Sequence, residues 1–443
     1  MKDFTAIVLA AGEGTRMKSS LPKVLHTICG SPMIDYVLDG LRQLRIKKIV
    51  AVVNKSQEQL LDYLEGYKDV KLSFQKKPLG TADAVSSARK FFKGNILVIC
   101  ADTPLIRKET LQNLINRHKE SNASCTILTA FLDNPSSFGR VIRDEYSKVS
   151  RIIEENDASS SQKQVKEVNS GIYCFNAQDL SQALSNVKMN TAKKEYYLTD
   201  VVEILYKQSR RIETFIGSDA NEALGINSRM DLSSANEAMR LRIIENLMQQ
   251  GVSIVDTKTT FINQGFLIGK ETVIYPFTVI ESGVKIGSNC SVGPFCHLRQ
   301  GTIVKDNAVV GNFTEAVRST IGEGTRCKHL SYLGDTSVGK GVNIGAGTVI
   351  ANYDGENKNK TVIKDKSFIG CDTVIVAPAT IGKGAVTGAG AVITKGANIK
   401  DNSVVVGVPA KPLVKTKEKV KAAKKVARKV AKKSAKKKKS KKR

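Results

Sequence analysis

The chain has 443 residues, which is enough for about two to four domains, and no apolar run approaches the 18 or so residues of a membrane span. Its eight cysteines are scattered without a CxxC pair or a zinc-type cluster, which argues for reduced thiols in a cytosol and against a structural metal. The formal net charge is +27, but residues 415–443 hold 17 Lys or Arg and one Glu, so the rest of the chain is only moderately basic.

The first half of the chain alternates short aliphatic runs with segments of helical period. This alternation is typical of βαβ units and predicts a mostly parallel sheet in a Rossmann-like α/β domain. The predicted strands are Thr5–Leu9, Lys48–Val53, Lys71–Phe74, Asn95–Cys100 and Cys125–Phe131. Ligands of such sheets lie beyond the carboxyl ends of the strands, so we expect a site after the first and the fourth of these strands.

A glycine-rich loop follows the first predicted strand and reads Ala10-Ala11-Gly12-Glu13-Gly14-Thr15-Arg16-Met17, with Pro22-Lys23 shortly beyond. Backbone N–H groups of such a loop can bind phosphate, and Arg16 and Lys23 would add positive charge. Met17 stands where the dinucleotide fingerprint and the P-loop each need a glycine, so neither motif fits. An ordinary tight turn is the alternative interpretation.

The loop, L-A-A-G-x-G-T-R-M followed by P-K, resembles that of the sugar-1-phosphate nucleotidyltransferases. Other segments that resemble this family are Gln75 with Leu79-Gly80-Thr81-Ala82, Asp102, Phe138-Gly139-Arg140, Glu154, Asn169-Ser170-Gly171, Glu195-Tyr196-Tyr197-Leu198-Thr199-Asp200 and Gly225-Ile226-Asn227. The resemblance implies that UTP and a sugar phosphate bind at Leu9, Ala10, Ala11, Gly12, Gly14, Lys23, Gln75, Gly80, Thr81, Gly139, Glu154, Asn169 and Asn227.

The same resemblance implies that Asp102 and Asn227 hold Mg²⁺ and that Lys23 and Arg16 are catalytic cations. When a sugar-1-phosphate oxygen attacks the α-phosphorus of UTP and pyrophosphate leaves, catalysis consists mostly of positioning and charge neutralisation. Mg²⁺ prefers few carboxylates together with phosphate oxygens and water, which one Asp and one Asn would satisfy. A lone Asp after a strand is also often a helix N-cap.

One long helix is predicted over residues 229–250. An apolar stripe runs along it, and Gly251 suits the position just after its end. The residues of the stripe are Leu232, Ala235, Met239, Ile243 and Leu247. In the resembling family such a helix links two domains. An ordinary core helix of the first domain is the alternative.

Beyond this helix an aliphatic residue returns at every sixth position, at Ile268, Ile274, Ile280, Ile286, Val292, Leu298, Val304 and Val310. The pattern resumes at Ile321 and continues to Val405. A six-residue period fits neither a helix nor a flat strand, and glycine often follows the aliphatic where the chain must turn a corner. This is the hexapeptide signature of a parallel β-helix, in which the aliphatic side chains stack inward from coil to coil. A generic β-sandwich is the alternative.

The two parts together resemble the bifunctional enzymes that combine N-acetylglucosamine-1-phosphate uridylyltransferase with glucosamine-1-phosphate acetyltransferase. The resemblance implies a left-handed parallel β-helix, a homotrimer, and acetyl-coenzyme A and UTP as co-substrates. It also implies binding of acetyl-coenzyme A and glucosamine-1-phosphate at Arg299, Tyr332, Asn343, Ala346, Asn352, Tyr353, Cys371 and Ala389, with His329 as general base. Imidazole suits that role near pH 7, although a lone His is usually structural.

Three positions of the β-helix depart from this family. Val317 stands where a Lys usually meets the acceptor, Cys371 where a Ser lies near acetyl-coenzyme A, and Val406 where an Arg often reaches the cofactor. Arg318 is adjacent to Val317, but strand alternation predicts that it faces the other way. Lys358 remains nearby in the 354–360 loop.

The predicted organisation is a uridylyltransferase domain at 1–228, a linker helix at 229–250, a β-helix acetyltransferase domain at 251–412 and a Lys-rich tail at 413–443. The main hypothesis is a cytoplasmic bifunctional enzyme that makes UDP-N-acetylglucosamine for cell-wall precursors. One rival is an enzyme with uridylyltransferase activity alone, whose β-helix is a trimerisation scaffold. Another is a nucleic-acid-associated protein that acts through residues 415–443, whose positive charge suits a polyanion.

Overall fold

The computed structural model describes residues 3–191 and 193–413, and the chain divides into two compact units that meet in sequence at Arg242 and Ile243. The Lys-rich segment 415–443, with its predicted polyanion contact, lies outside the described residues. Within the described residues no helix is long and apolar enough to cross a membrane.

The first unit is built on a mixed sheet with the strand order β11-β7-β10-β6-β1-β4-β5, and a β8–β9 hairpin extends from β10. Strands β1, β4, β5 and β6 are parallel to one another, while β10 is antiparallel to both β6 and β7. The strands are β1 (Phe4–Leu9), β4 (Lys48–Val53), β5 (Val70–Phe74), β6 (Asn95–Cys100), β7 (Cys125–Phe131), β8 (Arg140–Arg143), β9 (Val149–Ile153), β10 (Glu167–Asn176) and β11 (Ile212–Ile216), with a short pair β2 (Thr27–Ile28) and β3 (Ser31–Pro32). The five predicted strands are therefore confirmed, and the sheet carries additional antiparallel strands.

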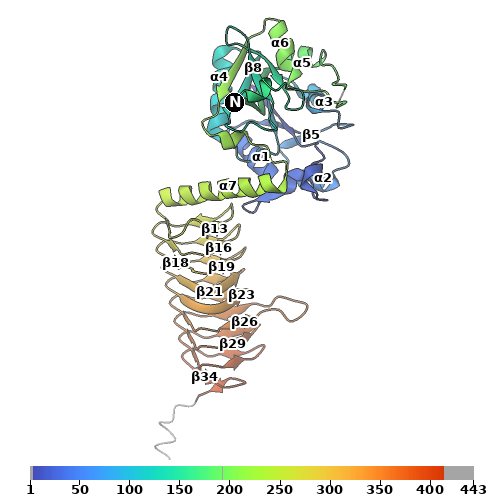
Figure 1. The fold of residues 1–443 in the computed structure, drawn as a ribbon. Helices are drawn as coiled ribbons and strands as arrows, with labels where there is room; N and C mark the ends of the chain where they lie inside the picture. The colour runs from blue at the N-terminus through green and yellow to red at the C-terminus, as the bar shows by residue number, and fades with distance from the viewer. Residues whose placement is uncertain (1–2, 192, 414–443) are drawn as a thin grey trace, which may run out of the picture. The chain divides into compact units, whose positions relative to one another are not determined.

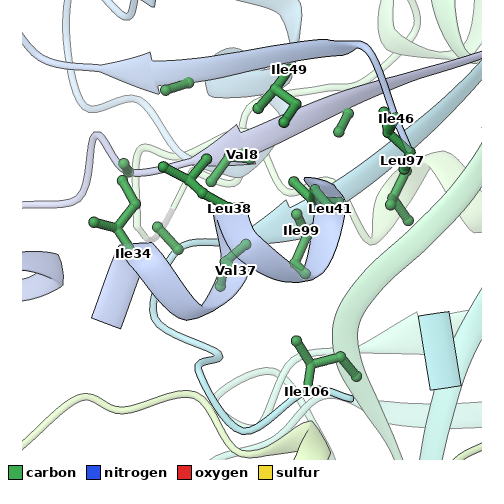
Figure 2. Close-up of a cluster of buried hydrophobic side chains, with 14 of the residues drawn as sticks. Val8, Ile34, Val37, Leu38, Leu41, Ile46, Ile49, Leu97, Ile99 and Ile106 are labelled. Atoms are coloured by element: carbon green, nitrogen blue, oxygen red, sulfur yellow. The ribbon is translucent and has the colours of Figure 1, made fainter. Parts of the chain in front are cut away.

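The helices of this unit are α1 (Met33–Gln43), α2 (Glu58–Glu65), α3 (Thr81–Ser87), α4 (Lys108–Ser121), α5 (Ala177–Leu184) and α6 (Asp200–Lys207). Helix α1 places Ile34, Val37, Leu38 and Leu41 on one stripe, which packs on side chains of β1, β4 and β6 such as Val8 (Figure 2). Burying a side chain of this size stabilises the folded state by about 1.5–3 kcal/mol relative to leaving it exposed, so this packing holds α1 on the sheet.

Helix α7 (Arg229–Gln249) begins in the first unit and ends in the second. Its beginning carries a reciprocal cap. The backbone N–H of Asp231 donates to the Ser228 hydroxyl at 3.2 Å, and the backbone N–H of Ser228 donates to the Asp231 carboxylate at 2.9 Å. The observed bounds agree with the predicted helix to within one residue at its end.

The second unit is a parallel β-helix, whose short strands stack as rungs (Figure 1). One face is formed by β12 (Ser253–Ile254), β15 (Val273–Ile274), β18 (Ser291–Val292), β21 (Val309–Val317), β23 (Arg326–Gly334), β25 (Asn343–Ile344), β28 (Phe368–Ile369), β31 (Val386–Thr387) and β34 (Val404–Val406). The second is formed by β13 (Phe261–Ile262), β16 (Val279–Ile280), β19 (His297–Leu298), β26 (Val349–Ala351), β29 (Val374–Val376) and β32 (Val392–Ile393), joined through the long strands β21 and β23. The third is formed by β14 (Leu267–Ile268), β17 (Lys285–Ile286), β20 (Ile303–Val304), β22 (Thr320–Ile321), β24 (Thr336–Val338), β27 (Thr361–Ile363), β30 (Ala379–Ile381) and β33 (Asn398–Ile399). Strand β35 (Lys411–Pro412) ends the stack antiparallel to β34.

The rungs follow a regular register. Val273 pairs with Ser291 and Ser291 with Val309, so these coils take 18 residues each, or three hexapeptides. The next two coils, from Val309 through Arg326 to Asn343, take 17 residues each. The hexapeptide side chains from Ile274 to Val310 are almost fully buried, which confirms the inward stack. Outside the stack, Phe277, Phe295 and Phe313 lie over one another with ring centroids 4.7 and 4.9 Å apart, the spacing of neighbouring rungs. They form an exposed aromatic ridge.

Candidate active sites

Two neighbouring cavities lie at the carboxyl ends of β1 and β6 in the first unit, with volumes of about 560 and 510 Å³. Both are lined by Cys100, Asp102 and Glu154. The first cavity is also lined by the predicted residues Leu9, Ala10, Ala11, Gly12, Gly14, Lys23, Gln75, Gly80 and Thr81. The second is also lined by the predicted residues Arg16, Gly139, Asn169 and Asn227. The structure thus brings together the side chains predicted for the uridylyltransferase site.

The glycine-rich loop leaves β1 and runs into the short turn at Thr15–Met17. Gly14 has φ +62°, and a Cβ there would lie 2.7 Å from Cβ of Lys23, so only glycine allows the loop to pack on the Lys23 stem. Around Gly12, by contrast, a Cβ would meet no protein atom within 4 Å. The loop is therefore more than a tight turn: it holds Lys23 in place and leaves open space beside its own backbone.

Lys23, Asp102, Asn227 and Arg16 converge where the two cavities meet. The Lys23 ammonium donates to Oδ2 of Asp102 in a short contact and to Oδ1 of Asn227 at 3.2 Å. Nη2 of Arg16 also donates to Oδ1 of Asn227, at 2.9 Å. A carboxylate oxygen and an amide oxygen from distant parts of the chain therefore point at one cation. A carboxylate oxygen and an amide oxygen are among the ligands that Mg²⁺ prefers, so the residues present fit that ion.

Backbone contacts fix both oxygen donors. The N–H of Ile226 donates to the carbonyl of Asp102 at 2.9 Å, which ties the Asn227 segment to the turn after β6. Asn227 in turn donates its N–H to the Asp231 carboxylate at the start of α7. The alternative of Asp102 as a helix N-cap is wrong, because α4 begins only at Lys108 and its N-cap is Arg107.

The Gly80–Thr81 turn and the segment around Tyr196 form part of the wall of the first cavity. Gly80 has φ +101°, and a Cβ there would lie 2.5 Å from the carbonyl oxygen of Tyr196, so the close approach requires glycine. The hydroxyl of Thr81 accepts from the N–H of Leu198 at 2.9 Å. Gln75, which is buried, donates to the Gly80 carbonyl at 3.1 Å.

Glu154 lines both cavities. Its carboxylate accepts a hydrogen bond of 3.0 Å from the Thr199 hydroxyl. Burial raises the pKa of Glu154 above its usual range, against the opposing effect of that hydrogen bond. Asn169 is held by its own contacts, with Nδ2 donating to the Tyr173 hydroxyl at 2.7 Å and Oδ1 accepting from the N–H of Gly171. These polar groups suit recognition of sugar hydroxyls.

Four residues predicted for the acetyltransferase stack along one corner of the β-helix. Asn312 pairs with His329 between β21 and β23, and the N–H of Gly347 donates to the carbonyl of Leu330 one coil further on. The N–H of Asp372 then donates to the Ala346 carbonyl and that of Gly390 to the Cys371 carbonyl. His329, Ala346, Cys371 and Ala389 therefore occupy equivalent positions of successive coils, and the imidazole of His329 is exposed. We call these four residues the corner column.

A second group gathers at the end of β23 and involves Arg299, Tyr332 and Asn352. Nη1 of Arg299 donates to Glu315 at 2.8 Å, and Glu315 pairs with Tyr332 across the neighbouring strands. Nδ2 of Asn352 donates to the Asp335 carboxylate at 2.5 Å. The structure thus places the predicted acetyltransferase residues in two groups: the corner column and this polar cluster.

The expected direction of Arg318 was wrong. Its guanidinium donates to the Asp335 carboxylate at 2.6 and 2.7 Å, and so joins the cluster that contains Asn352. The reason is a left-handed backbone at Arg318, with φ +47°, which ends β21 at Val317 and breaks strand alternation. Val317 itself is buried, with 3% of its surface exposed. The Arg318 guanidinium holds the pKa of Asp335 below its usual range, and Lys358 acts in the same direction.

The remaining predicted residues lie around these groups. Asn343 is in β25 beside Arg326 of the preceding coil, three residues before Ala346 of the corner column. Tyr353 lies in the loop between β26 and β27, where it is exposed and its hydroxyl donates to the Gly355 carbonyl. Val406 lies one coil beyond Gly388, the residue before Ala389, since a Cβ on Gly388 would lie 2.7 Å from Cγ1 of Val406. Cys371 is exposed and its thiol is free.

Sequence reasoning missed the contribution of α7 to the second cavity. Asp231, Ser234, Ala235 and Ala238 of this helix line the 510 Å³ cavity. Ala235 was predicted as part of an apolar core stripe. The signal that could have found them is the pair of small or polar residues, Ser234 and Ala238, one turn apart on the helix that begins at the Asn227 motif.

Comparisons with known proteins agree with both halves. A nucleotidyl transferase family model matches residues 5–229, and the bacterial transferase hexapeptide model matches 267–300, 283–315 and 360–395. Fold and sites thus define a nucleotidyltransferase joined in one chain to a hexapeptide-repeat transferase.

Full-length relatives identify the family. The chain is 42% identical to the bifunctional protein GlmU of a Geobacillus species over 86% of this chain and 90% of the relative. It is 43% identical to that of Pelotomaculum thermopropionicum, over 85% and 90% of the two chains, and 41% identical to that of Desulfitobacterium hafniense, over 92% and 96%. The chain belongs to the GlmU family of bifunctional proteins. It is an acetyltransferase and a uridylyltransferase that makes UDP-N-acetylglucosamine, a cell-wall precursor, from nucleotide and acetyl-coenzyme A substrates.

Proposed function

We propose that uridylyl transfer takes place between the two cavities of the first unit, on the Lys23, Arg16, Asp102 and Asn227 cluster. The observation that supports this proposal is the convergence of the Asp102 and Asn227 oxygens on one cation. UTP occupies the cavity of the glycine-rich loop, and N-acetylglucosamine-1-phosphate occupies the cavity of Glu154 and Asn169. Asp102 and Asn227 would hold Mg²⁺, which neutralises phosphate charge when bound.

The residues of the chain then have separate tasks. Lys23 and Arg16 stabilise the charge that develops on the phosphates as the sugar phosphate oxygen attacks and pyrophosphate leaves. The Gly80–Thr81 turn and Gln75 position the uracil. Glu154 accepts from the sugar and Asn169 helps to align it, so that the attacking oxygen is held in reach of the α-phosphorus.

For acetyl transfer, we assign the general base to His329 and the acetyl-coenzyme A contacts to Asn343, Ala346, Cys371 and Ala389. The corner column supports this assignment, because an extended cofactor fits residues that repeat from rung to rung about 4.8 Å apart. His329 takes a proton from the amine as its nitrogen attacks the thioester carbonyl, and the coenzyme A thiolate leaves.

The acceptor phosphate is assigned to the cluster of Arg299, Tyr332 and Asn352, with Tyr353 at its edge. Arg318 and Lys358 bring two cations to Asp335 in this cluster, and the Arg318 guanidinium is the proposed contact of the phosphate. Arg318 then takes over the electrostatic role of the cation that is absent at Val317. The rival with a scaffold β-helix then has less support, because the β-helix still offers a base and a phosphate-binding cation.

The hexapeptide repeats and the relatives indicate an oligomer, and we propose a homotrimer. The exposed aromatic ridge of Phe277, Phe295 and Phe313 supports this proposal, because its next rung is Leu330, which is 61% exposed and adjacent to His329. An apolar ridge of this kind suits burial against a neighbouring subunit. Light scattering should give a trimer at micromolar concentration, whereas a monomer would contradict the assignment. Phe295→Glu should weaken the trimer.

Residues 1–228, 229–250 and 251–412 would then be a uridylyltransferase domain, a linker helix and an acetyltransferase domain. The enzyme would act in the cytoplasm, where its co-substrates are made. For the tail at 413–443, we propose sequence-independent contact of residues 415–443 with a polyanion, on the strength of its charge of +16.

The test of the bifunctional assignment is mass spectrometry of the reaction products. The purified protein is incubated with glucosamine-1-phosphate, acetyl-coenzyme A, UTP and Mg²⁺, and one component is omitted at a time. UDP-N-acetylglucosamine should form only with the full set, and N-acetylglucosamine-1-phosphate should form without UTP. Absence of acetylation at millimolar substrates would favour the scaffold rival.

A further inference from the structure

From the same cluster we infer that Lys23 and Arg16 form a latch that keeps a divalent cation off Asp102 and Asn227 until a nucleoside triphosphate is bound. This inference rests on the proposed metal site. It adds an order of binding at that site: the free chain binds the metal poorly, and nucleotide and metal bind cooperatively. The side chains responsible are those of Lys23 and Arg16.

The geometry of the latch is a shared pair of oxygens. The Lys23 ammonium contacts Oδ2 of Asp102 and lies 3.2 Å from Oδ1 of Asn227, while Arg16 donates to the same Asn227 oxygen at 2.9 Å. The side chains of Lys23 and Asp102 are only 14% and 16% exposed, so water screens their attraction weakly. Each of the two proposed metal oxygens is therefore already in contact with a cation of the chain.

The charges in the cluster oppose a metal as well. Lys23 and Arg16 carry two positive charges against the single carboxylate of Asp102, and Asn227 is neutral. A divalent cation that enters would be repelled by both cations and would have to displace an ammonium from its carboxylate. Among residues 3–191 and 193–413, no group of three His, Cys, Asp or Glu side chains converges to offset that cost. The free chain therefore has a weak metal site.

A triphosphate changes this balance because it offers both cations better partners. Arg16 is exposed, and Lys23 lines the cavity next to the glycine-rich loop, so phosphate oxygens in that cavity lie within reach of both. The Lys23 stem is fixed against Gly14, so only the end of its side chain has to swing from Asp102 to a phosphate. The movement frees the carboxylate and the amide oxygen, and the phosphates add oxygen ligands of their own. By linkage, the metal must then tighten nucleotide binding by the same factor.

The probe for this inference is Mn²⁺, whose free and bound forms are distinguished by electron paramagnetic resonance. Mn²⁺ is titrated into the full-length protein alone, and again with the unreactive analogue α,β-methylene-UTP at saturation. We expect weak binding by the wild-type protein alone and binding at least tenfold tighter for the ternary complex than for the analogue in buffer. Lys23→Met keeps the stem that packs on Gly14 and removes the charge. It should raise Mn²⁺ affinity of the free protein about tenfold or more, since a charge-assisted contact no longer competes. Arg16→Met should act in the same direction with a smaller effect.

Two controls separate the latch from the metal site. Lys76→Ala removes one positive charge from an exposed position near the same cavity, and it should leave Mn²⁺ binding unchanged. Asp102→Ala should abolish the gain of Mn²⁺ affinity in the ternary complex. If Asp102→Ala leaves that gain intact, the metal site itself is wrong. If Asp102→Ala removes it while Lys23→Met and Arg16→Met bind Mn²⁺ like the wild-type protein alone, the site stands and the latch is overturned.

Discussion

Replacing Arg318 with methionine tests the assignment of the acceptor phosphate. Methionine keeps an unbranched stem but removes the guanidinium, which donates hydrogen bonds of 2.6 and 2.7 Å to Asp335. We expect KM for glucosamine-1-phosphate to rise about tenfold to a hundredfold, because a lost charge-assisted contact costs about 1.5–3 kcal/mol. The kcat for acetyl transfer should change little, since His329 is untouched. The rate of uridylyl transfer should stay at the wild-type value, because that site lies in the other unit.

The same substitution has a smaller effect on stability. The Arg318 side chain is 40% exposed, so its ion pair is screened, and its loss should lower the free energy of unfolding by about 1 kcal/mol or less. The pair depresses the pKa of Asp335, so its stabilisation is present above the usual pKa of an Asp and is lost as the pH falls through the depressed value. The unfolding midpoints of mutant and wild type should therefore differ at neutral pH and converge in acid.

The assay is the initial rate of coenzyme A release at varied glucosamine-1-phosphate, with urea unfolding measured in parallel. Arg326→Met is the matched control, because Arg326 is an exposed arginine of β23 outside the Asp335 cluster. It should leave KM unchanged. A lower unfolding midpoint for Arg318→Met together with a wild-type KM would mean that the guanidinium serves only Asp335, and the assignment would be refuted.

Four further predictions concern the other proposed roles. Asp102→Ala should abolish uridylyl transfer and spare acetyl transfer, as measured by pyrophosphate and coenzyme A release; near-normal uridylyl transfer would exclude the metal assignment. His329→Ala should lower kcat for acetyl transfer by about 10²–10⁴, the usual effect of a positioned base, and leave uridylyl transfer intact. The pKa of Glu154 is raised, so KM for N-acetylglucosamine-1-phosphate should increase as the pH falls through that raised value, where the carboxylate is protonated and accepts fewer hydrogen bonds. Glu154→Gln should raise KM at neutral pH and remove this dependence; an unchanged pH profile would contradict the role. Deleting residues 415–443 should remove salt-sensitive DNA binding, whose log–log slope against salt is expected near −5 if about six phosphates are neutralised, and should preserve both activities.

The predicted strands and the β-helix agree with the structure because their signals are local and repeated. Cys125–Phe131 is a short run of β-branched and aromatic residues bounded by breaks, and it is a strand with those bounds. In the β-helix, each hexapeptide places one aliphatic side chain inward, so the eight hexapeptide positions from Ile268 to Val310 support one another. A local error would have to recur in every coil.

Features that depend on a single backbone angle or on contacts between distant segments could not be predicted from such local sequence signals. The direction of Arg318 follows from a left-handed φ that strand alternation does not contain. The contact of Lys23 with both Asp102 and Asn227 joins three segments that are far apart in sequence. The sequence motifs therefore predicted that these residues belong to one site, but not that the Lys23 ammonium contacts the side-chain oxygens of the other two. The antiparallel strand β10 between β6 and β7 is likewise set by tertiary pairing.

The 18-residue register of the β-helix has a consequence for how such a chain can change its length. Val273, Ser291 and Val309 occupy the same place in consecutive coils. Removing residues 273–290 would therefore rejoin Thr272 to Ser291 with every later side chain still facing the same way. The stack would become shorter by one rung, about 4.8 Å, and the two cut surfaces would already be complementary. Insertions and deletions of whole coils in this part of the chain thus change only the height of the stack. The later coils from Val309 to Arg326 and from Arg326 to Asn343 have 17 residues each, so a corner can also lose one residue without turning the interior side chains out to solvent.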